Sequence, residues 1–206
     1  MDQRLCRAWM AQFASLVDAA AERLTALDAA IGDGDHGVNM RRGMQAAMAA
    51  LADGSSETPG KVLIATGRSL VAKTGGAAGP LYGTGLRRAG KALGDAESVG
   101  VAEVGEALAA MLAGIQDLGA AAEGDKTMVD ALIPAVATFK AAADDGLAAA
   151  AAAAAQAAAD AATATIPMRA RKGRASYLGE RSIGHEDPGA ASTALLLRAL
   201  ADVAAA

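Results

Sequence analysis

The chain has 206 residues, of which 53% are hydrophobic and 2% aromatic, and its net charge at neutral pH is −4. This length suits one domain, residues 1–206, with a core of ordinary size, and the mild negative charge without a long basic run argues against a nucleic-acid-binding protein. The single cysteine, Cys6, excludes an intrachain disulfide and favours a reducing compartment.

The sequence has no feature of a secreted or membrane-bound protein. No apolar segment follows the charged residues within 1–10, as it would in a signal peptide. The uncharged tract at 146–159 is nearly all alanine, and it is too short and too weakly hydrophobic to cross a bilayer. We therefore expect a cytoplasmic protein without a membrane partner.

Much of the hydrophobic content is alanine, the strongest helix former, so we expect an all-α protein. The first helix covers residues 3–28, where apolar side chains recur every three or four positions. It places Asp28 at its C-terminal end. A carboxylate there opposes the helix dipole, so we expect a positive partner, and a metal ion would serve.

Three carboxylates, Asp28, Asp33 and Asp35, fall within eight positions and are separated by glycines. Carboxylates this close repel one another unless a cation lies between them. An all-oxygen ligand set favours a hard ion such as Mg2+, which usually adds water and phosphate oxygens to its shell. The alternative is a solvated acidic turn. The calcium-binding EF-hand pattern fails, because the twelfth position counted from Asp33 is Met44 rather than glutamate.

A second helix follows the acidic turn, with Met40, Met44 and Leu51 on one face, and ends at residues 53–56. His36 and Asn39 lie at or near its first turn, where free backbone N–H groups and the helix dipole favour an anion. The metal ligands and a helix start that suits phosphate are therefore adjacent. This adjacency points to the phosphates of a nucleotide.

A third helix is expected at 59–74 and a fourth from about Pro80, separated by a glycine-rich turn at 75–79. This turn either exposes N–H groups to a phosphate or forms a tight connection between helices, and both readings stay open. A fifth helix covers 99–120. Thr127 and Asp130 resemble a capping box at the start of a sixth helix.

Pro134 can kink the sixth helix, and the alanine tract at 148–162 predicts a seventh helix that packs through small residues.

Residues 165–189 lack helical periodicity and concentrate arginines, which match phosphate oxygens better than lysines do. We favour a phosphate-binding loop here over a solvated or partner-facing surface. Asp187 as N-cap and Pro188 in the first turn then predict an eighth helix at 190–203.

In an up-and-down arrangement, odd-numbered helices end at one pole, and the eighth helix begins there. The acidic turn, the glycine-rich turn, the turn at 124–128 and the arginine-rich segment would then meet at one end. We expect an eight-helix up-and-down barrel or bundle with the nucleotide site at that end.

Five segments carry longer motifs: 27–43 with GDGDHG, 75–84 with GGAAGPLYGT, 124–128 with GDKTM, 173–182 with GRASYLGERS, and 185–190 with HEDPGA. Together they closely resemble the ADP-binding L subunit of dihydroxyacetone kinases over nearly the whole chain. The resemblance implies an eight-helix barrel that binds ADP or ATP with two Mg2+ ions. The metal ligands that it implies are Asp28, Asp33 and Asp35, and the nucleotide-binding positions are His36, Asn39, Met40, Gly76, Ala77, Ala78, Thr84, Gly124, Thr127, Met128, Arg174, Asp187, Pro188 and Gly189.

Phosphoryl transfer depends on positioning and charge neutralisation, so the three aspartates and Arg174 are the expected catalytic residues. His36 either hydrogen-bonds a phosphate or is a satisfied helix-cap histidine. Family members usually have serine where this chain has Ala78, so a hydroxyl contact is lost there and the backbone N–H remains. No nucleophile is required, and Cys6 is not one.

The family has two branches. In one, ADP stays bound and is rephosphorylated in place by a phosphohistidine protein of the phosphotransferase system, the M subunit, and dihydroxyacetone is held on a K subunit. In the other, a fused kinase uses exchangeable ATP. The separate chain and residues 183–189 resemble the first branch, which we expect here, as a homodimer acting on a triose. The remaining alternative is a regulatory module that binds ADP and Mg2+ and contacts a transcription regulator.

Overall fold

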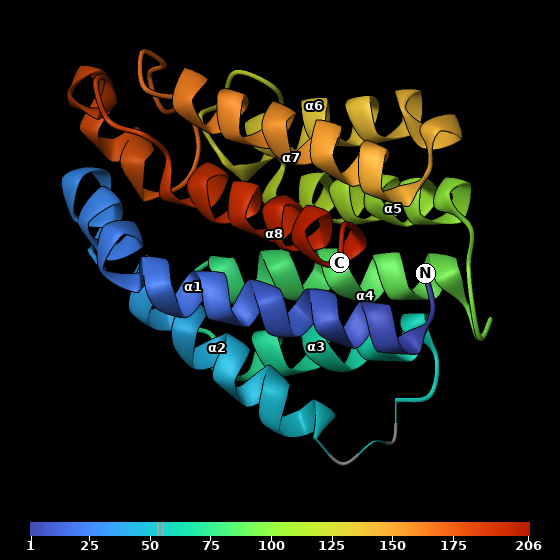
Figure 1. Ribbon diagram of the computed structural model, residues 1–206. Coiled ribbons are helices and arrows are strands. Elements are labelled where there is room, and N and C mark those ends of the chain that lie inside the picture. Colours follow the sequence, from blue (N-terminus) through green and yellow to red (C-terminus); the bar gives the residue numbers. More distant parts are fainter. Residues whose placement is uncertain (53, 55) are drawn as a thin grey trace.

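The computed structural model describes residues 1–52, 54 and 56–206. These residues form eight α-helices and two short 3-10 helices and no strand, which confirms the all-α prediction (Figure 1). The expected end of the second helix at 53–56 falls partly on Asp53 and Ser55, which lie outside the described residues. The elements are α1 (Gln3–Ile31), α2 (His36–Leu51), α3 (Pro59–Lys73), α4 (Ala78–Leu93), α5 (Val101–Gly119), α6 (Met128–Ala141), η1 (Ala143–Asp145), α7 (Leu147–Ala164), η2 (Arg174–Ser182) and α8 (Pro188–Ala204).

The helices run alternately up and down, as predicted. In Figure 1, α1 ends and α2 begins at the left pole, and the segment between α7 and α8 folds over the same pole. The chain returns to the right pole between α2 and α3 and between α4 and α5. The four special segments, which are the acidic turn, the glycine-rich turn, the turn at 124–128 and the arginine-rich segment, therefore lie at one end of the bundle.

Three boundaries differ from the sequence-based expectation. The first helix continues past Asp28 to Ile31, so Asp28 lies in its last turn. The fourth helix begins at Ala78 rather than at Pro80. The segment at 165–189 is not wholly irregular, because it contains η2, which is interrupted at Gly179.

Local capping explains where several helices begin. Thr127 and Asp130 form the predicted capping box at α6, and Asp187 caps α8 by accepting a hydrogen bond from the Ala190 N–H. Each bond satisfies a backbone N–H group that has no partner inside its helix. The sixth helix runs through Pro134 without a break.

Small residues allow the helices to approach closely. A Cβ atom added to Gly67 on α3 would lie 2.6 Å from the carbonyl oxygen of Gly83 on α4, and one added to Gly83 would lie 2.6 Å from the Gly67 oxygen. The alanine tract forms α7, as predicted, and buries Ala150, Ala154 and Ala158. These contacts bring backbones together where larger side chains would hold them apart.

The main hydrophobic cluster contains residues from all eight α-helices. The Nε1 of Trp9 on α1 donates a hydrogen bond to the Leu196 carbonyl on α8 at 2.9 Å, and Phe13 packs near Tyr82. Cys6 is fully buried in this core, where burial raises the pKa of its thiol to about 12. Within the described part of the chain, no helix is long and apolar enough to span a bilayer.

Candidate functional site

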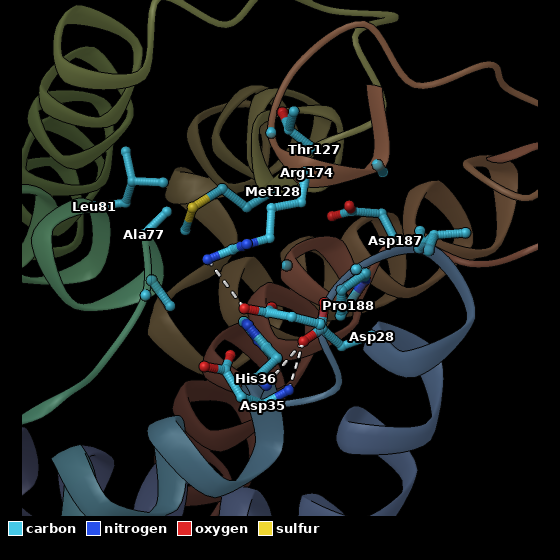
Figure 2. Close-up of a pocket in the computed structure, with 18 of the residues that line it drawn as sticks. Asp28, Asp35, His36, Ala77, Leu81, Thr127, Met128, Arg174, Asp187 and Pro188 are labelled. Atoms are coloured by element: carbon cyan, nitrogen blue, oxygen red, sulfur yellow. Dashed lines mark hydrogen bonds and ion pairs between the residues drawn. The ribbon is translucent and has the colours of Figure 1, made fainter. Parts of the chain in front are cut away.

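A pocket of about 180 Å³ opens at the left pole of the bundle, where the four special segments meet (Figure 2). Its lining comes from the end of α1, the start of α2, the glycine-rich turn, and the starts of α4, α6 and α8, together with the arginine-rich segment. Most of the nucleotide and metal positions expected from the sequence line it: Asp28, Asp33, Asp35, His36, Asn39, Gly76, Ala77, Ala78, Thr127, Met128, Arg174, Asp187, Pro188 and Gly189.

The three carboxylates meet at one side of this pocket. One potential ligand atom from each of Asp28, Asp33 and Asp35 lies within 4.8 Å of the other two. Oxygen atoms this close, all from carboxylates, form a donor set that suits Mg2+. The residues present therefore fit a hard divalent cation, with positions left for water and phosphate oxygens.

The first of these carboxylates also has a structural role. Asp28 Oδ2 accepts hydrogen bonds from the backbone N–H groups of Asp35, at 2.8 Å, and His36, at 3.1 Å. Asp28 at the end of α1 therefore caps the start of α2. The sequence predicted a positive partner for Asp28, and these N–H groups, at the positive end of the α2 dipole, supply part of that compensation.

A positive side chain faces the acidic cluster from the arginine-rich segment. Arg174 Nη2 lies 3.1 Å from Asp33 Oδ2, and both side chains are partly exposed. Arg174 is the first residue of η2, and it reaches across the pocket toward the α1–α2 turn (Figure 2). Its guanidinium can therefore reach both the carboxylates and an anion held beside them.

The neighbouring glycine-rich turn packs directly on α2. A Cβ atom added to Gly75 would lie 2.8 Å from Asn39 Oδ1, so a larger residue here would have to displace the Asn39 amide. Arg42 Nη2 donates to the same Asn39 oxygen at 2.7 Å and fixes its orientation. Gly76 follows with φ +65, a left-handed conformation that glycine adopts without strain.

His36 joins the pocket to a buried polar network. Its Nε2 lies 2.9 Å from Ser192 Oγ, which lies 2.7 Å from the hydroxyl of Tyr82. The Tyr82 hydroxyl also lies 2.9 Å from Thr193 Oγ1. Burial lowers the pKa of His36, although the nearby Asp28 and Asp35 charges raise it. The imidazole is therefore neutral at physiological pH, and one of its nitrogens already has a partner.

Asp187 is the most strongly perturbed carboxyl in the pocket. It is 8% exposed, and burial raises its pKa to about 7, with a further increase from the Asp130 charge. The hydrogen bond from the Ala190 N–H and the charge of Lys126 act in the opposite direction. This carboxyl therefore changes its charge near neutral pH, while it still caps α8.

Three of the nucleotide positions implied by the sequence do not line the pocket. Met40 is fully buried, because it lies on the face of α2 that packs into the core. Thr84 lies two residues beyond Tyr82, about 200° around the helix from it. Gly124 forms the turn before α6, where its N–H donates to Asp130 Oδ1 and its φ is +86.

Sequence reasoning missed several lining residues, among them Lys126, Leu81 and Tyr82. Leu81 and Tyr82 lie in the motif at 75–84 and Lys126 in the motif at 124–128, but the motifs do not show which side chains point into the pocket. Lys126 is the least expected, because lysine is rarely buried and this one is 1% exposed. The other lining residues that were not predicted are Ile31, Gly32, Gly75, Lys172, Gly173 and Ala175.

Comparison with known proteins places this geometry in a family. The DAK2 domain pattern matches residues 30–202. The chain is 40% identical over 195 residues to the ADP-binding subunit DhaL of the PEP-dependent dihydroxyacetone kinase of Escherichia coli (strain K12), covering 94% of this chain and 93% of that subunit. It is 43% identical to the D-erythrulose kinase of Mycolicibacterium smegmatis, covering 96% of this chain and 35% of that protein.

One solved structure carries a nucleotide analogue and a metal. The chain is similar to the dihydroxyacetone kinase from C. freundii in complex with AMP-PNP and Mg2+, with a TM-score of 0.74 and 27% identity. This similarity covers 98% of this chain and 34% of that one. The chain therefore spans nearly the whole E. coli subunit and about a third of each of the two larger kinases.

Proposed function

The chain belongs to the DAK2 domain family, and from this membership we propose that it is the nucleotide-binding subunit of a phosphoenolpyruvate-dependent dihydroxyacetone kinase. It holds ADP or ATP with two Mg2+ ions and transfers the phosphoryl group to dihydroxyacetone on a partner subunit. The observation that carries this proposal is the juxtaposition of three carboxylates, a helix N-terminus and Arg174 in one pocket.

The pocket divides into parts with different chemistry. Asp28, Asp33 and Asp35 would hold the metal ions, which when bound draw charge from the phosphate oxygens. On the side of the pocket away from Asp187, Ala77, Leu81 and Met128 gather and offer an apolar surface for a purine ring (Figure 2). A nucleotide lying between these parts has its phosphates beside the carboxylates and its base beside the apolar side chains.

Other residues of the chain then orient the phosphates of the nucleotide. Arg174 is long enough to turn from Asp33 to a phosphate oxygen, where its charge stabilises the transferring group. Backbone N–H groups at 76–78 and those of α2 beyond His36, whose own N–H is bound to Asp28, are the neutral donors to phosphate. His36 is neutral and hydrogen-bonded to Ser192, so we assign it to hydrogen bonding with phosphate rather than to proton abstraction.

The acceptor is proposed to arrive on a separate protein, because large apolar side chains are exposed on segments that reach the pocket pole. Among the described residues, those with large exposed hydrophobic side chains are Val38, Val71, Leu118, Tyr177 and Ile183. Val38, Val71, Leu118 and Tyr177 belong to elements that begin or end at the pocket pole, and Ile183 directly follows η2. Exposed apolar side chains on these segments fit a partner that docks over the mouth of the pocket.

Two experiments test the proposal. The chain purified with Mg2+ is expected to carry ADP that exchanges slowly with labelled free ATP, and to support phosphoryl transfer to dihydroxyacetone when the K and M partner subunits are added. Slow exchange with no transfer would leave a regulatory ADP-binding module. Rapid exchange with ATP-driven transfer would favour an ordinary ATP-dependent kinase, and no nucleotide binding would refute the proposal.

The substrate needs its own comparison, since one relative is named for erythrulose rather than dihydroxyacetone. Transfer to dihydroxyacetone and to D-erythrulose should be measured with the same partner, because the pocket of this chain faces the nucleotide and the partner selects the triose. A cytoplasmic location, a homodimeric state and one folding unit over residues 1–206 complete the proposal. Size-exclusion chromatography with light scattering tests the dimer.

A further inference from the structure

Lys126 has no role in the proposed reaction, yet it lines the pocket and is 1% exposed. It comes directly before Thr127, the N-cap of α6. Its φ is +62, a left-handed conformation that residues other than glycine adopt at a cost in energy. A lysine that is both buried and strained must be held by specific contacts.

Those contacts are four backbone carbonyl oxygens. Lys126 Nζ lies 2.9 Å from the carbonyl oxygen of Thr165, 3.4 Å from that of Ile166, 3.1 Å from that of Met168 and 2.5 Å from that of His185, and its three N–H groups are shared among these four acceptors. A ring of carbonyl oxygens around one ammonium group resembles the shell that proteins build around a monovalent cation. Burial lowers the pKa of Lys126, and the charge of Asp187 raises it.

The four carbonyls belong to the two ends of the arginine-rich segment. Thr165, Ile166 and Met168 lie where the segment leaves α7, and His185 lies just before α8. The Gly184 N–H also donates to the Ile166 carbonyl at 2.8 Å. The ammonium group therefore holds together the base of a loop whose middle presents Arg174 to the pocket.

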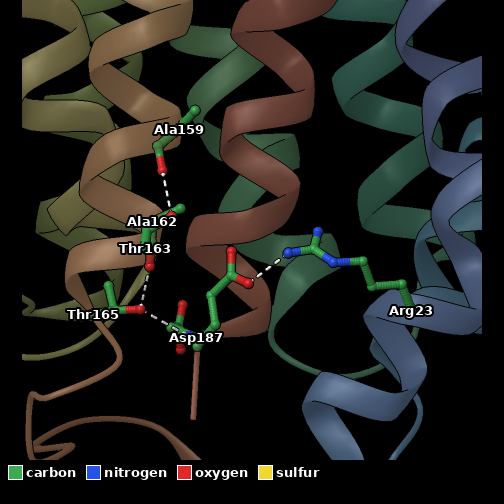
Figure 3. A network of polar contacts seen from close by, with 7 residues as sticks. Arg23, Ala159, Ala162, Thr163, Thr165 and Asp187 are labelled. Atoms are coloured by element: carbon green, nitrogen blue, oxygen red, sulfur yellow. Dashed lines mark hydrogen bonds and ion pairs between the residues drawn. The ribbon is translucent and has the colours of Figure 1, made fainter. Parts of the chain in front are cut away.

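The same junction fixes Asp187. Thr165 Oγ1 donates to the Ala162 carbonyl at 2.6 Å and accepts from the Asp187 N–H at 2.9 Å (Figure 3). Nearby, Arg23 on α1 pairs with Glu186 (Figure 3). Thr165 is thus bound through its carbonyl to Lys126 and through its hydroxyl to Asp187, so one junction sets the base of the loop and the start of α8.

We propose that Lys126 is a positioning residue, whose ammonium group binds the carbonyl oxygens at the base of residues 165–185 and so holds Arg174 and Asp187 in place around the nucleotide pocket. The expected effect on MgADP binding rests on the proposed function. The effect of Lys126 on the order of the loop can be measured without any ligand.

The test uses Lys126→Ala with chemical rescue by propylammonium, which replaces the missing part of the side chain. In the nucleotide-free chain, Lys126→Ala is expected to speed hydrogen exchange at the amides of Gly184 and Asp187 at least tenfold. Exchange in α3 and α4 should stay at the wild-type rate. MgADP should bind at least tenfold more weakly, and propylammonium should restore both properties, whereas propanol, which has no charge, should not.

Lys140→Met is the matched control, because it removes a lysine from α6, the helix that Lys126 precedes, and Lys140 pairs with Glu106 at the surface. It should keep wild-type loop exchange and MgADP affinity. If Lys126→Ala does not fold, Lys126→Gln keeps two N–H donors without the charge, and it is expected to fold and to show the same loop-specific loss.

Unchanged loop exchange in a folded Lys126 variant would overturn the inference, as would a loss that propylammonium fails to restore. If the wild-type chain does not bind MgADP, the proposed function fails. The hydrogen-exchange result would then still decide whether Lys126 holds the loop.

Discussion

Arg174 Nη2 lies 3.1 Å from Asp33 Oδ2, so the arginine proposed to contact phosphate pairs with a carboxylate proposed to bind metal. The two roles compete at Asp33, because the guanidinium and a divalent cation are both positive and are attracted to the same carboxylate charge. Metal and nucleotide binding should therefore release Arg174 toward the phosphates. The pair is solvent-exposed, and such pairs contribute little to stability.

Arg174→Ala should consequently separate metal binding from nucleotide binding. We expect Mg2+ alone to bind slightly more tightly, because a competing cation is removed from Asp33. MgADP should bind more weakly, and phosphoryl transfer should fall at least about tenfold, since one charge contact to phosphate is lost. Calorimetric titrations and the coupled transfer assay measure these effects. Arg181→Ala, in the same segment but outside the pocket, is the control, and equal effects of the two variants would count against the assignment.

Substitutions of Asp28 should distinguish its two roles. Asp28→Asn keeps an oxygen for the N–H groups of Asp35 and His36 but loses the charge, so we expect normal stability and no metal-dependent retention of ADP. Asp28→Ala also loses the cap and should lower the free energy of unfolding by about 0.5–2 kcal/mol. Urea unfolding and ADP retention after gel filtration test this.

Asp33→Ala and Asp35→Ala should lose ADP retention without the loss of stability that we expect for Asp28→Ala. Asp18→Asn, on the exposed face of α1, is the control for a lost negative charge. Normal ADP retention in Asp33→Ala or Asp35→Ala would remove that residue from the metal site.

Asp187 should give the metal-free chain an unusual pH dependence. In the folded chain its carboxyl keeps a proton up to about pH 7, whereas in the unfolded chain it ionises near its ordinary value of 3.8. Between these values the folded state binds more protons, so this group makes the chain less stable as pH rises from about 4 to about 7. Above pH 7 the carboxyl is ionised in both states, so its effect on the free energy of unfolding no longer changes with pH.

Asp187→Asn should remove this dependence, because asparagine also caps helices and does not ionise. The variant should therefore be more stable than the wild type at pH 8, and the difference should shrink toward pH 4. Urea unfolding at several pH values, without Mg2+, measures it, with the exposed Asp160→Asn as control. A stability difference that does not vary with pH would contradict the raised pKa.

The glycine contact between α3 and α4 should tolerate no side chain. Gly67→Ala would bring a methyl group against the Gly83 carbonyl, a backbone atom that cannot move aside, and should cost about 1–3 kcal/mol of stability. Gly105→Ala is the control, because its nearest neighbour is the flexible Lys140 side chain, at 3.2 Å. Thermal unfolding of both variants tests the difference, and equal stability would refute it.

Tyr177 should contribute to partner docking and not to nucleotide binding. It is 88% exposed at the pocket pole. Tyr177→Ala is expected to weaken association with the K subunit about tenfold, the loss typical of a buried aromatic anchor, and to leave MgADP affinity unchanged. Lys61→Ala at the opposite pole is the control. Surface plasmon resonance with immobilised K subunit measures both, and unchanged association would place the docking face elsewhere.

The sequence by itself determined the helices and the pole at which the special segments meet. Apolar periodicity located most of the α-helices and alanine content located α7, and capping residues such as Thr127 and Asp187 located two of the starts, because these signals act over one or two turns. Eight helices in an up-and-down order then put the acidic turn and the arginine-rich segment at one end.

Only the tertiary structure decided which side chains enter the pocket and what holds them there. The motifs contain Met40 and Thr84, which face away from the pocket, and Lys126, which faces it, and no local pattern distinguishes them. The partners of Lys126 are carbonyl oxygens about 40–60 residues further along the chain. Such contacts depend on how α6, α7 and α8 pack, and backbone carbonyls occur at every residue, so the sequence carries no mark of which ones a buried ammonium will bind.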